Sequence, residues 1–88
     1  MSNHSGSYML NEVIEKLDKY EVFQRLGKEK SQQLVIEIVR LARRQYDCNS
    51  GEILDGHSEL LHICYQCVQA AEVLDGEGVC PDCRKRWG

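Results

Sequence analysis

Four of the five cysteines form two identical pairs, Cys64-x-x-Cys67 and Cys80-x-x-Cys83, which are separated by twelve residues. This spacing predicts one metal site with four thiolate ligands, holding a single structural zinc ion per chain. A zinc ion with four protein ligands keeps no open coordination position, so it stabilises a fold but does not bind or activate a substrate. We therefore expect this site to hold the chain together, and we expect no enzyme activity from it.

Each pair fits a tight turn, or knuckle, in which both sulfur atoms face one metal ion and backbone N–H groups donate to them. The segment between the knuckles suits a β-hairpin. Glu72-Val73-Leu74 is compatible with a strand, and Asp75-Gly76-Glu77-Gly78 is a strong turn signal. Pro81 fixes φ inside the second knuckle, where a turn requires it. These features predict a short hairpin closed at its base by the metal.

Other chemistry of paired cysteines stays open at this point. Two disulfides are one alternative, but the chain shows no signal peptide. Thiol exchange is another, although the βαβ context of such redox proteins is absent, and a redox-sensing zinc switch is a related option. Spacing alone does not separate zinc from iron. Free thiolate ligands favour a reducing compartment, so we expect a cytoplasmic protein.

Residues 62–87, from His-Ile-Cys-Tyr-Gln-Cys to Cys-Pro-Asp-Cys-Arg-Lys-Arg-Trp, resemble a zinc ribbon. The Cys-Pro-Asp-Cys half is similar to the second knuckle of zinc ribbons and of rubredoxins. Rubredoxins often carry a glycine after each knuckle, whereas Val68 and Arg84 stand there in this chain, and the spacing between the pairs is shorter here. Both departures argue against an iron electron-transfer site.

This resemblance covers under a third of the chain and implies a metal and a local fold more than a function. Zinc ribbons occur in nucleic-acid binders, polymerase subunits and protein-docking modules. The layout of two C-x-x-C pairs in a short chain is also similar to that of small bacterial zinc-binding anti-sigma factors. The resemblance therefore implies a regulatory class of protein and names no partner.

Two helices are expected before the cysteines. The first covers residues 8–26, with a break near 18–21, and the second covers residues 28–46. Asn11 is a candidate cap of the first helix, and Gly27 ends it. Apolar residues recur at three- and four-residue steps in both helices, namely Leu10, Val13, Ile14, Leu17, Tyr20, Phe23, Leu26, Leu34, Val35, Ile38, Leu41, Ala42 and Tyr46.

The 88 residues make one small domain, or a helical module joined to a metal module. We divide the chain into a disordered tail (1–7), a helical hairpin (8–47), a linker (48–61) and a zinc ribbon (62–88). The predicted fold class is therefore a small α+β metal-bound protein. A core of this size is marginal on its own, and zinc offsets that, since its binding is worth roughly 10–16 kcal/mol in zinc-finger peptides.

The second helix is apolar over more than one face. Leu34-Val35-Ile36 and Ile38-Val39 leave only Glu37 as a break, so one amphipathic partner helix does not cover all of it. Either the first helix and the metal module cover two sides, or the surplus face forms a homodimer. Lys28-Glu29-Lys30 after Gly27 favours a plain helical hairpin over a helix-turn-helix motif.

Charge differs between the two halves. Residues 1–51 carry 8 Lys+Arg and 7 Asp+Glu, which gives a net charge of +1. Residues 52–88 carry 3 Lys+Arg and 7 Asp+Glu, which gives a net charge of −4. Nucleic-acid binding normally requires clustered Lys and Arg. The candidates are Arg40, Arg43 and Arg44 on the second helix and the C-terminal tail 84–87, where Trp87 can stack on a base or pack on the ribbon. The acidic half favours a protein partner with a basic surface instead.

Three further residues carry chemistry of low specificity. His62 lies near Cys64 and is a spare metal ligand, but four cysteines already suffice. Cys48 and His57 form a nucleophile and base only if a cleft and an orienting group exist. A solvated histidine and a thiol at a helix end are the plainer interpretations. Tyr65 and Gln66, at the tip of the first knuckle, are candidate interface residues.

We therefore expect a small zinc-binding regulator or adaptor that binds a protein partner, with transcription machinery as the expected context. The alternative is a nucleic-acid-binding regulator that uses Arg40, Arg43, Arg44 and the basic C-terminal tail. Steep weakening of binding with salt would distinguish phosphate contacts from an apolar protein interface. The chain has no apolar run approaching the ~20 residues of a membrane span.

Overall fold

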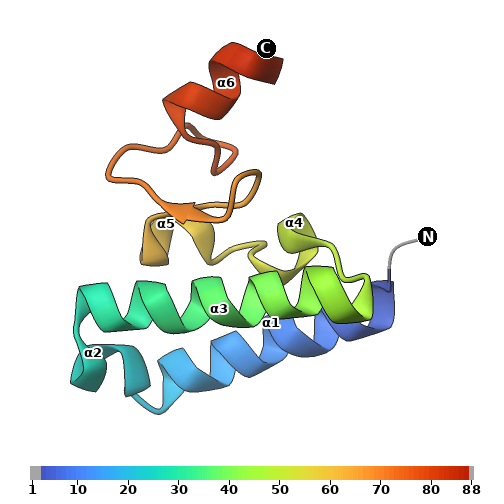
Figure 1. The fold of residues 1–88 in the computed structure, drawn as a ribbon. Helices are drawn as coiled ribbons and strands as arrows, with labels where there is room; N and C mark the ends of the chain where they lie inside the picture. The colour runs from blue at the N-terminus through green and yellow to red at the C-terminus, as the bar shows by residue number, and fades with distance from the viewer. Residues whose placement is uncertain (1–2, 88) are drawn as a thin grey trace.

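Two long antiparallel helices form the base of the molecule (Figure 1). The computed structural model describes residues 3–87, without the side chain of Trp87. Helices α1 (His4–Lys19) and α3 (Lys28–Tyr46) lie side by side, and the short helix α2 (Val22–Leu26) connects them. Among the described residues, no helix is both long enough and apolar enough to cross a membrane.

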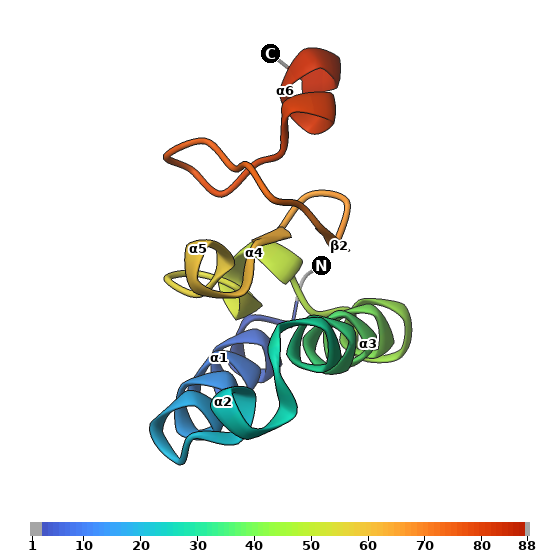
Figure 2. The same cartoon turned by 90° about the vertical axis from the view of Figure 1, so that its left-hand side faces the viewer.

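The remaining elements are stacked on this base in two further tiers, as the view along the helices shows (Figure 2). They are α4 (Ser50–Ile53), α5 (Ser58–Leu61), β1 (Ile63–Cys64), β2 (Gln69–Ala70) and α6 (Pro81–Trp87). The two strands form an antiparallel two-stranded sheet. The chain is thus a small α+β protein with N-terminal helices, a short sheet and a cluster of cysteines near its C-terminus.

Helix α1 begins at His4, earlier than the sequence indicated. Asn3 caps it, because its side-chain oxygen accepts a hydrogen bond from the Gly6 N–H at 2.9 Å. Ser7 is buried, and its hydroxyl accepts a hydrogen bond from the Asn49 N–H at 2.8 Å. The expected disordered tail of residues 1–7 is therefore corrected from Asn3 onward, and residues 1–2 lie outside the described part. Small polar residues favour disorder and helix caps alike, which is why composition misled us.

Asn11 caps a different helix from the one expected. Its side-chain amide donates hydrogen bonds to the backbone carbonyls of Glu52, Ile53 and Asp55, at 3.1, 3.0 and 2.9 Å. The last carbonyls of a short helix have no partner inside that helix, and Asn11 supplies one for the end of α4. These hydrogen bonds attach the end of α4 to α1.

The break in the first helical segment and the helix over residues 28–46 are confirmed. Helix α1 ends at Lys19, and Glu21 takes a φ of +62° before α2 begins. Gly27 separates α2 from α3 with a φ of +87°, which glycine adopts at little cost. The Ser31 hydroxyl donates to the Phe23 carbonyl at 3.0 Å and holds the two helices at this corner.

One aliphatic core joins the base to the segment 48–61 and to the hairpin, and the buried residues around the second knuckle form a separate cluster. The aliphatic core includes Ile14, Val35, Val39, Ile53, Leu54, Leu61, Ile63 and Val68. The segment expected to be a linker therefore contains two short helices and supplies buried core residues. The division into four segments stays a prediction, but packing is continuous across residue 61.

The hairpin forms around the first knuckle and not between the two knuckles. Ile63 pairs with Ala70 and Cys64 pairs with Gln69. Residues 72–74, expected to be a strand, form none, because the chain enters helix α6 after Cys80 and leaves them no partner strand. The turn over residues 75–78 is formed, with the Gly78 N–H donating to the Asp75 carbonyl at 3.0 Å.

Candidate metal centre

The four predicted cysteine ligands converge on one point. Their sulfur atoms all lie within 4.8 Å of one another. The Sγ–Sγ distance is 3.7 Å for Cys64 and Cys83 and 3.9 Å for Cys67 and Cys80. Four sulfurs bound tetrahedrally to a metal at about 2.3 Å lie about 3.8 Å apart, so both distances fit such a site. All four thiols are free, which leaves them available to a metal ion.

The first knuckle is held by the sheet and by an unusual backbone conformation at Val68. The Val68 N–H donates to the Cys64 carbonyl at 2.9 Å and closes the turn. Val68 follows with a φ of +53°, the left-handed region that favours glycine. Its side chain is fully buried in the aliphatic core, and its carbonyl accepts a hydrogen bond from the Arg40 guanidinium at 3.1 Å. Burial and this contact together hold a β-branched residue where knuckles often place glycine.

The second knuckle is built on the start of a helix. Pro81 occupies the first position of α6, where its fixed φ suits the helix and its missing N–H is not needed. The Arg84 N–H donates to the Cys80 carbonyl at 3.0 Å, so Cys80 and Cys83 lie one turn apart on the same side. Arg84 therefore continues a helix and needs no left-handed conformation, which explains why no glycine stands there.

Asp75 fixes the turn that leads into the second knuckle. Its carboxylate accepts hydrogen bonds from the Glu77 N–H at 2.8 Å, the Val79 N–H at 3.1 Å and the Arg84 Nε at 2.7 Å. The Val79 N–H and the Arg84 guanidinium hold the pKa of this carboxyl below its usual range. This side chain thus joins the turn over 75–78 to helix α6.

The thiols of the cluster cannot all ionise without a cation. Burial alone would raise the pKa of Cys64, but backbone N–H groups of Cys67, Cys80 and Gln66 outweigh it and lower that pKa to about 7. Burial and the neighbouring thiols, Cys64 first, raise the pKa of Cys67 to about 12, and burial also raises that of Cys83. A bound metal cation would remove this repulsion and displace the protons.

The cysteine cluster is shielded from solvent except along one groove. Cys64, Cys80 and Cys83 are buried, whereas Cys67 is half-buried. A groove of about 410 Å³ runs along Cys67, Cys80 and Cys83 and reaches the exposed residue Val73. It gives a metal ion a path to sulfur atoms that the fold already holds together.

The other candidate residues lie outside this cluster. His62 is the left-handed residue after α5 and is not grouped with the cysteines among the described residues. The Cys48 thiol is buried beside the Tyr46 carbonyl at 3.8 Å, and not exposed at a helix end. The buried His57 Nε2 has no hydrogen-bond partner within residues 3–87. Cys48 and His57 thus share no hydrogen bond there.

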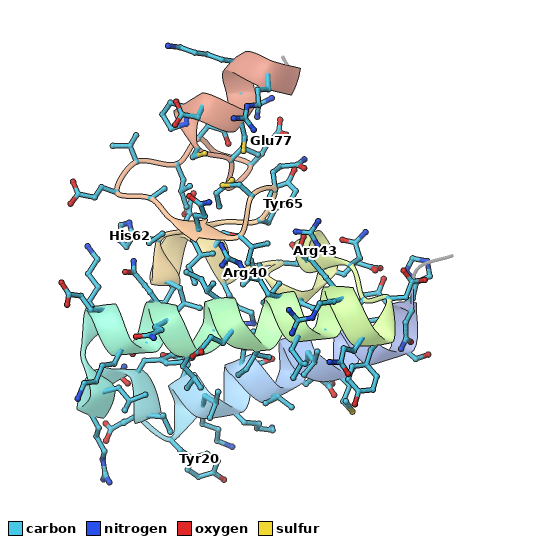
Figure 3. The ribbon with its side chains drawn as sticks, viewed as in Figure 1. Tyr20, Arg40, Arg43, His62, Tyr65 and Glu77 are labelled. Atoms are coloured by element: carbon cyan, nitrogen blue, oxygen red, sulfur yellow. The ribbon has the colours of Figure 1, made fainter. Side chains whose placement is uncertain are left out.

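The basic residues considered for nucleic-acid binding differ in their surroundings, and some of them are bound within the chain. The Arg40 side chain is directed at the hairpin, as the contact with Val68 requires (Figure 3). Arg84 is paired with Asp75 and, at 3.4 Å, with Glu77. Arg43 and Arg44 are exposed, and the side chain of Trp87 lies outside the described atoms. Two of the cations considered for nucleic-acid binding therefore make contacts within the chain.

An acidic cleft beside the metal cluster was missed by the sequence analysis. It has a volume of about 630 Å³ and lies between the segment 51–59 and the turn over 76–78. Asp55, Glu59 and Glu77 line it, and no Lys or Arg of the described chain does. Tyr65 forms part of its wall, on the same side of the molecule as Glu77 (Figure 3). Only folding brings these three residues to one cleft, since they are spread over more than twenty positions of the sequence.

Comparisons with family models, with curated proteins and with solved structures found no match to this chain. The site is therefore defined by its donor atoms and their geometry. Together with the fold, these define a small α+β protein with a four-cysteine cluster that could hold a metal ion.

Proposed function

We propose that this chain is a small zinc-binding adaptor that binds a basic surface on a protein partner and takes part in transcription regulation. Cys64, Cys67, Cys80 and Cys83 are the proposed ligands of one zinc ion per chain. Four thiolates in a tetrahedron suit zinc, and they leave no coordination position for a substrate. Elemental analysis of protein made without added metal tests this part, and iron in place of zinc would contradict it.

The observation that carries the adaptor function is the acidic cleft. One wall contains Asp55 and Glu59, and the other contains Glu77, on the turn that leads into the second knuckle. The metal would hold that second wall in place, because few apolar side chains pack there. A structural metal would thus shape a surface for a cationic side chain of a partner, and the net charge of −4 in residues 52–88 would attract such a partner.

A basic peptide tests the cleft directly. We expect a fluorescein-labelled 12-residue peptide rich in Lys and Arg to bind the zinc-loaded protein in a fluorescence anisotropy titration. The triple variant Asp55→Asn, Glu59→Gln, Glu77→Gln should weaken this binding at least ~10-fold, because it removes the three charges that line the cleft. The matched control Glu15→Gln, Glu21→Gln, Glu29→Gln removes three exposed charges from the base. Equal losses in both triples would mean that only net charge matters, which would refute the cleft.

Two further probes separate the finer parts of the proposal. A duplex DNA of 20 base pairs should not bind, and tight, steeply salt-dependent binding that Arg43→Ala and Arg44→Ala abolish would favour the nucleic-acid alternative. Purified bacterial RNA polymerase and its sigma factors should bind the wild-type protein and not the cleft triple. Binding of the peptide without binding of either transcription protein would retain the adaptor and refute the role in transcription.

A further inference from the structure

The face of the helical base opposite the upper tiers exposes a continuous apolar groove. Asn11 and Ser7 direct one side of α1 toward α4. Met9 and Leu10 lie on another side of α1 and face Ile38 and Leu41 of α3 across a groove of about 220 Å³. Ala42, Tyr46 and Cys48 complete its apolar lining. In Figure 2, α2 lies on the lower side of the two helices at the end nearest the viewer, and none of its residues lines this groove.

Several large apolar side chains are left in solvent along this groove. Met9 is 58% exposed, Leu41 is 44% exposed and Tyr46 is 61% exposed, and Val13 lies one turn after Met9. Together these four side chains expose roughly 400 Å² per chain, as much as the largest patch on a typical monomer.

From this face we infer that the protein is a homodimer, in which the α3 helices of two copies meet antiparallel about a twofold axis beside Leu41. A twofold interface needs a patch that fits itself. In this patch, Met9 and Leu41 line an apolar groove, so apolar side chains of one copy could pack into the apolar groove of the other. Two copies would form a four-helix layer from α1 and α3 of each chain.

The charges that border the face fit a second copy better than a charged partner. Glu12 and Lys16 on α1 and Glu37 and Arg44 on α3 balance to zero. Neither Glu37 nor Arg44 has an ion-pair partner within the described residues. Glu37 lies one turn before Leu41 and Arg44 one turn after it, so an antiparallel pair centred there brings Glu37 of each copy opposite Arg44 of the other.

Sedimentation equilibrium of the zinc-loaded protein at about 100 µM chain tests the dimer, since interfaces of modest size dissociate in the micromolar range. We expect a mass of twice the 10.1 kDa chain. Leu41→Glu should raise the dissociation constant roughly 100-fold, because the new carboxylate is buried without a partner. Leu60→Glu is the matched control, since Leu60 is 56% exposed on α5 and lines neither this groove nor the one at the cysteines. A wild-type mass of 10.1 kDa, or a Leu41→Glu variant that stays dimeric with its zinc bound, would overturn the inference.

Charge reversal tests the antiparallel arrangement. Glu37→Lys and Arg44→Glu should each weaken association about 3- to 10-fold, because each brings like charges together twice per dimer. The double variant should restore wild-type association, since it only exchanges the two partners. If the double variant is weaker than either single one, these residues do not meet and the proposed axis is wrong. Zinc content and far-UV circular dichroism show for each variant that the fold is kept.

Discussion

The helical base and the C-terminal metal module are stabilised in different ways. In the base, Ile14, Val35 and Val39 are fully shielded from solvent by other apolar side chains. Among the described side chains of residues 71–87, the buried ones are those of Val79, Cys80 and Cys83. Burying one aliphatic side chain contributes about 1.5–3 kcal/mol, so a single valine cannot order seventeen residues. The comparison indicates that hydrophobic burial holds the base and that metal coordination is needed by the module.

The boundary between the helical base and the metal module lies within residues 62–87, the segment that resembles a zinc ribbon. Ile63 and Val68 belong to the aliphatic core that they share with the base, and Arg40 of α3 donates to the Val68 carbonyl. The first knuckle therefore has two anchors, the core and the proposed metal. The second knuckle has the metal and the hydrogen bonds of Asp75. We expect loss of the metal to affect the second knuckle far more than the first.

Replacement of Cys83 by Ser should have the largest effect. It removes a ligand, so zinc binding worth roughly 10–16 kcal/mol in comparable sites is lost or severely weakened. Residues 71–87 should lose their protection from amide hydrogen exchange, while α1 and α3 keep theirs. Cys48→Ser is the control, because Cys48 is also buried but is not in the cluster. A Cys83→Ser protein with full zinc content and a protected C-terminus would refute the ligand assignment.

The pH dependence of metal affinity is the next largest effect. The raised pKa values of Cys67, about 12, and of Cys83 keep both thiols protonated at pH 7 in the absence of metal. Metal binding therefore releases at least two protons, and protons compete with the metal as the pH falls. Near pH 7 the apparent zinc affinity should fall at least ~100-fold for each unit that the pH is lowered. Chelator competition between pH 6 and pH 8 measures this slope, and one proton or fewer would contradict the pKa assignments.

The base was easier to predict from the sequence than the module. A helix is specified by neighbours three and four residues apart, so the spacing of Leu34, Val35 and Ile38 was enough to predict α3. The cysteine cluster was predictable for the same reason, since each C-x-x-C pair is a local motif. The helix caps were not predictable, because Asn3 and Asn11 have the same side chain. Only the fold decides which helix end each of them caps.

The features that were missed depend on contacts between distant parts of the chain. Glu72-Val73-Leu74 has strand propensity, but a strand needs a partner, and the only sheet of the described residues uses β1 and β2. The acidic cleft depends on how α5 lies against the turn over 76–78. The left-handed conformation of Val68 depends on its place after the hairpin, since Arg84 follows the second knuckle inside a helix and does not adopt it.

A core substitution in the base should have a smaller effect and leave the metal site intact. Ile14→Ala removes three carbons from a fully buried side chain, so we expect a loss of about 2–4 kcal/mol in the free energy of unfolding. Zinc stoichiometry should stay at one per chain. Leu60→Ala is the control, since Leu60 is 56% exposed and should lose less than about 1 kcal/mol. Urea denaturation of the zinc-loaded variants gives both values, and equal losses would mean that the base is not held by its core.

Val68 lies where the two regions meet, and it allows the smallest test. In ordinary helices and strands, glycine is less stable than alanine by roughly 0.5–1 kcal/mol. At a φ of +53° the order should invert, because alanine keeps the strain of the left-handed region, about 1 kcal/mol, and glycine does not. Both variants lose the buried valine side chain, so both should be less stable than the wild type. The free energy of unfolding of Val68→Gly should be equal to or higher than that of Val68→Ala. Urea denaturation of the two zinc-loaded variants measures the order. A Val68→Ala protein clearly more stable than Val68→Gly would show that the knuckle relaxes out of this conformation, and that the metal, and not the shared core, determines its shape.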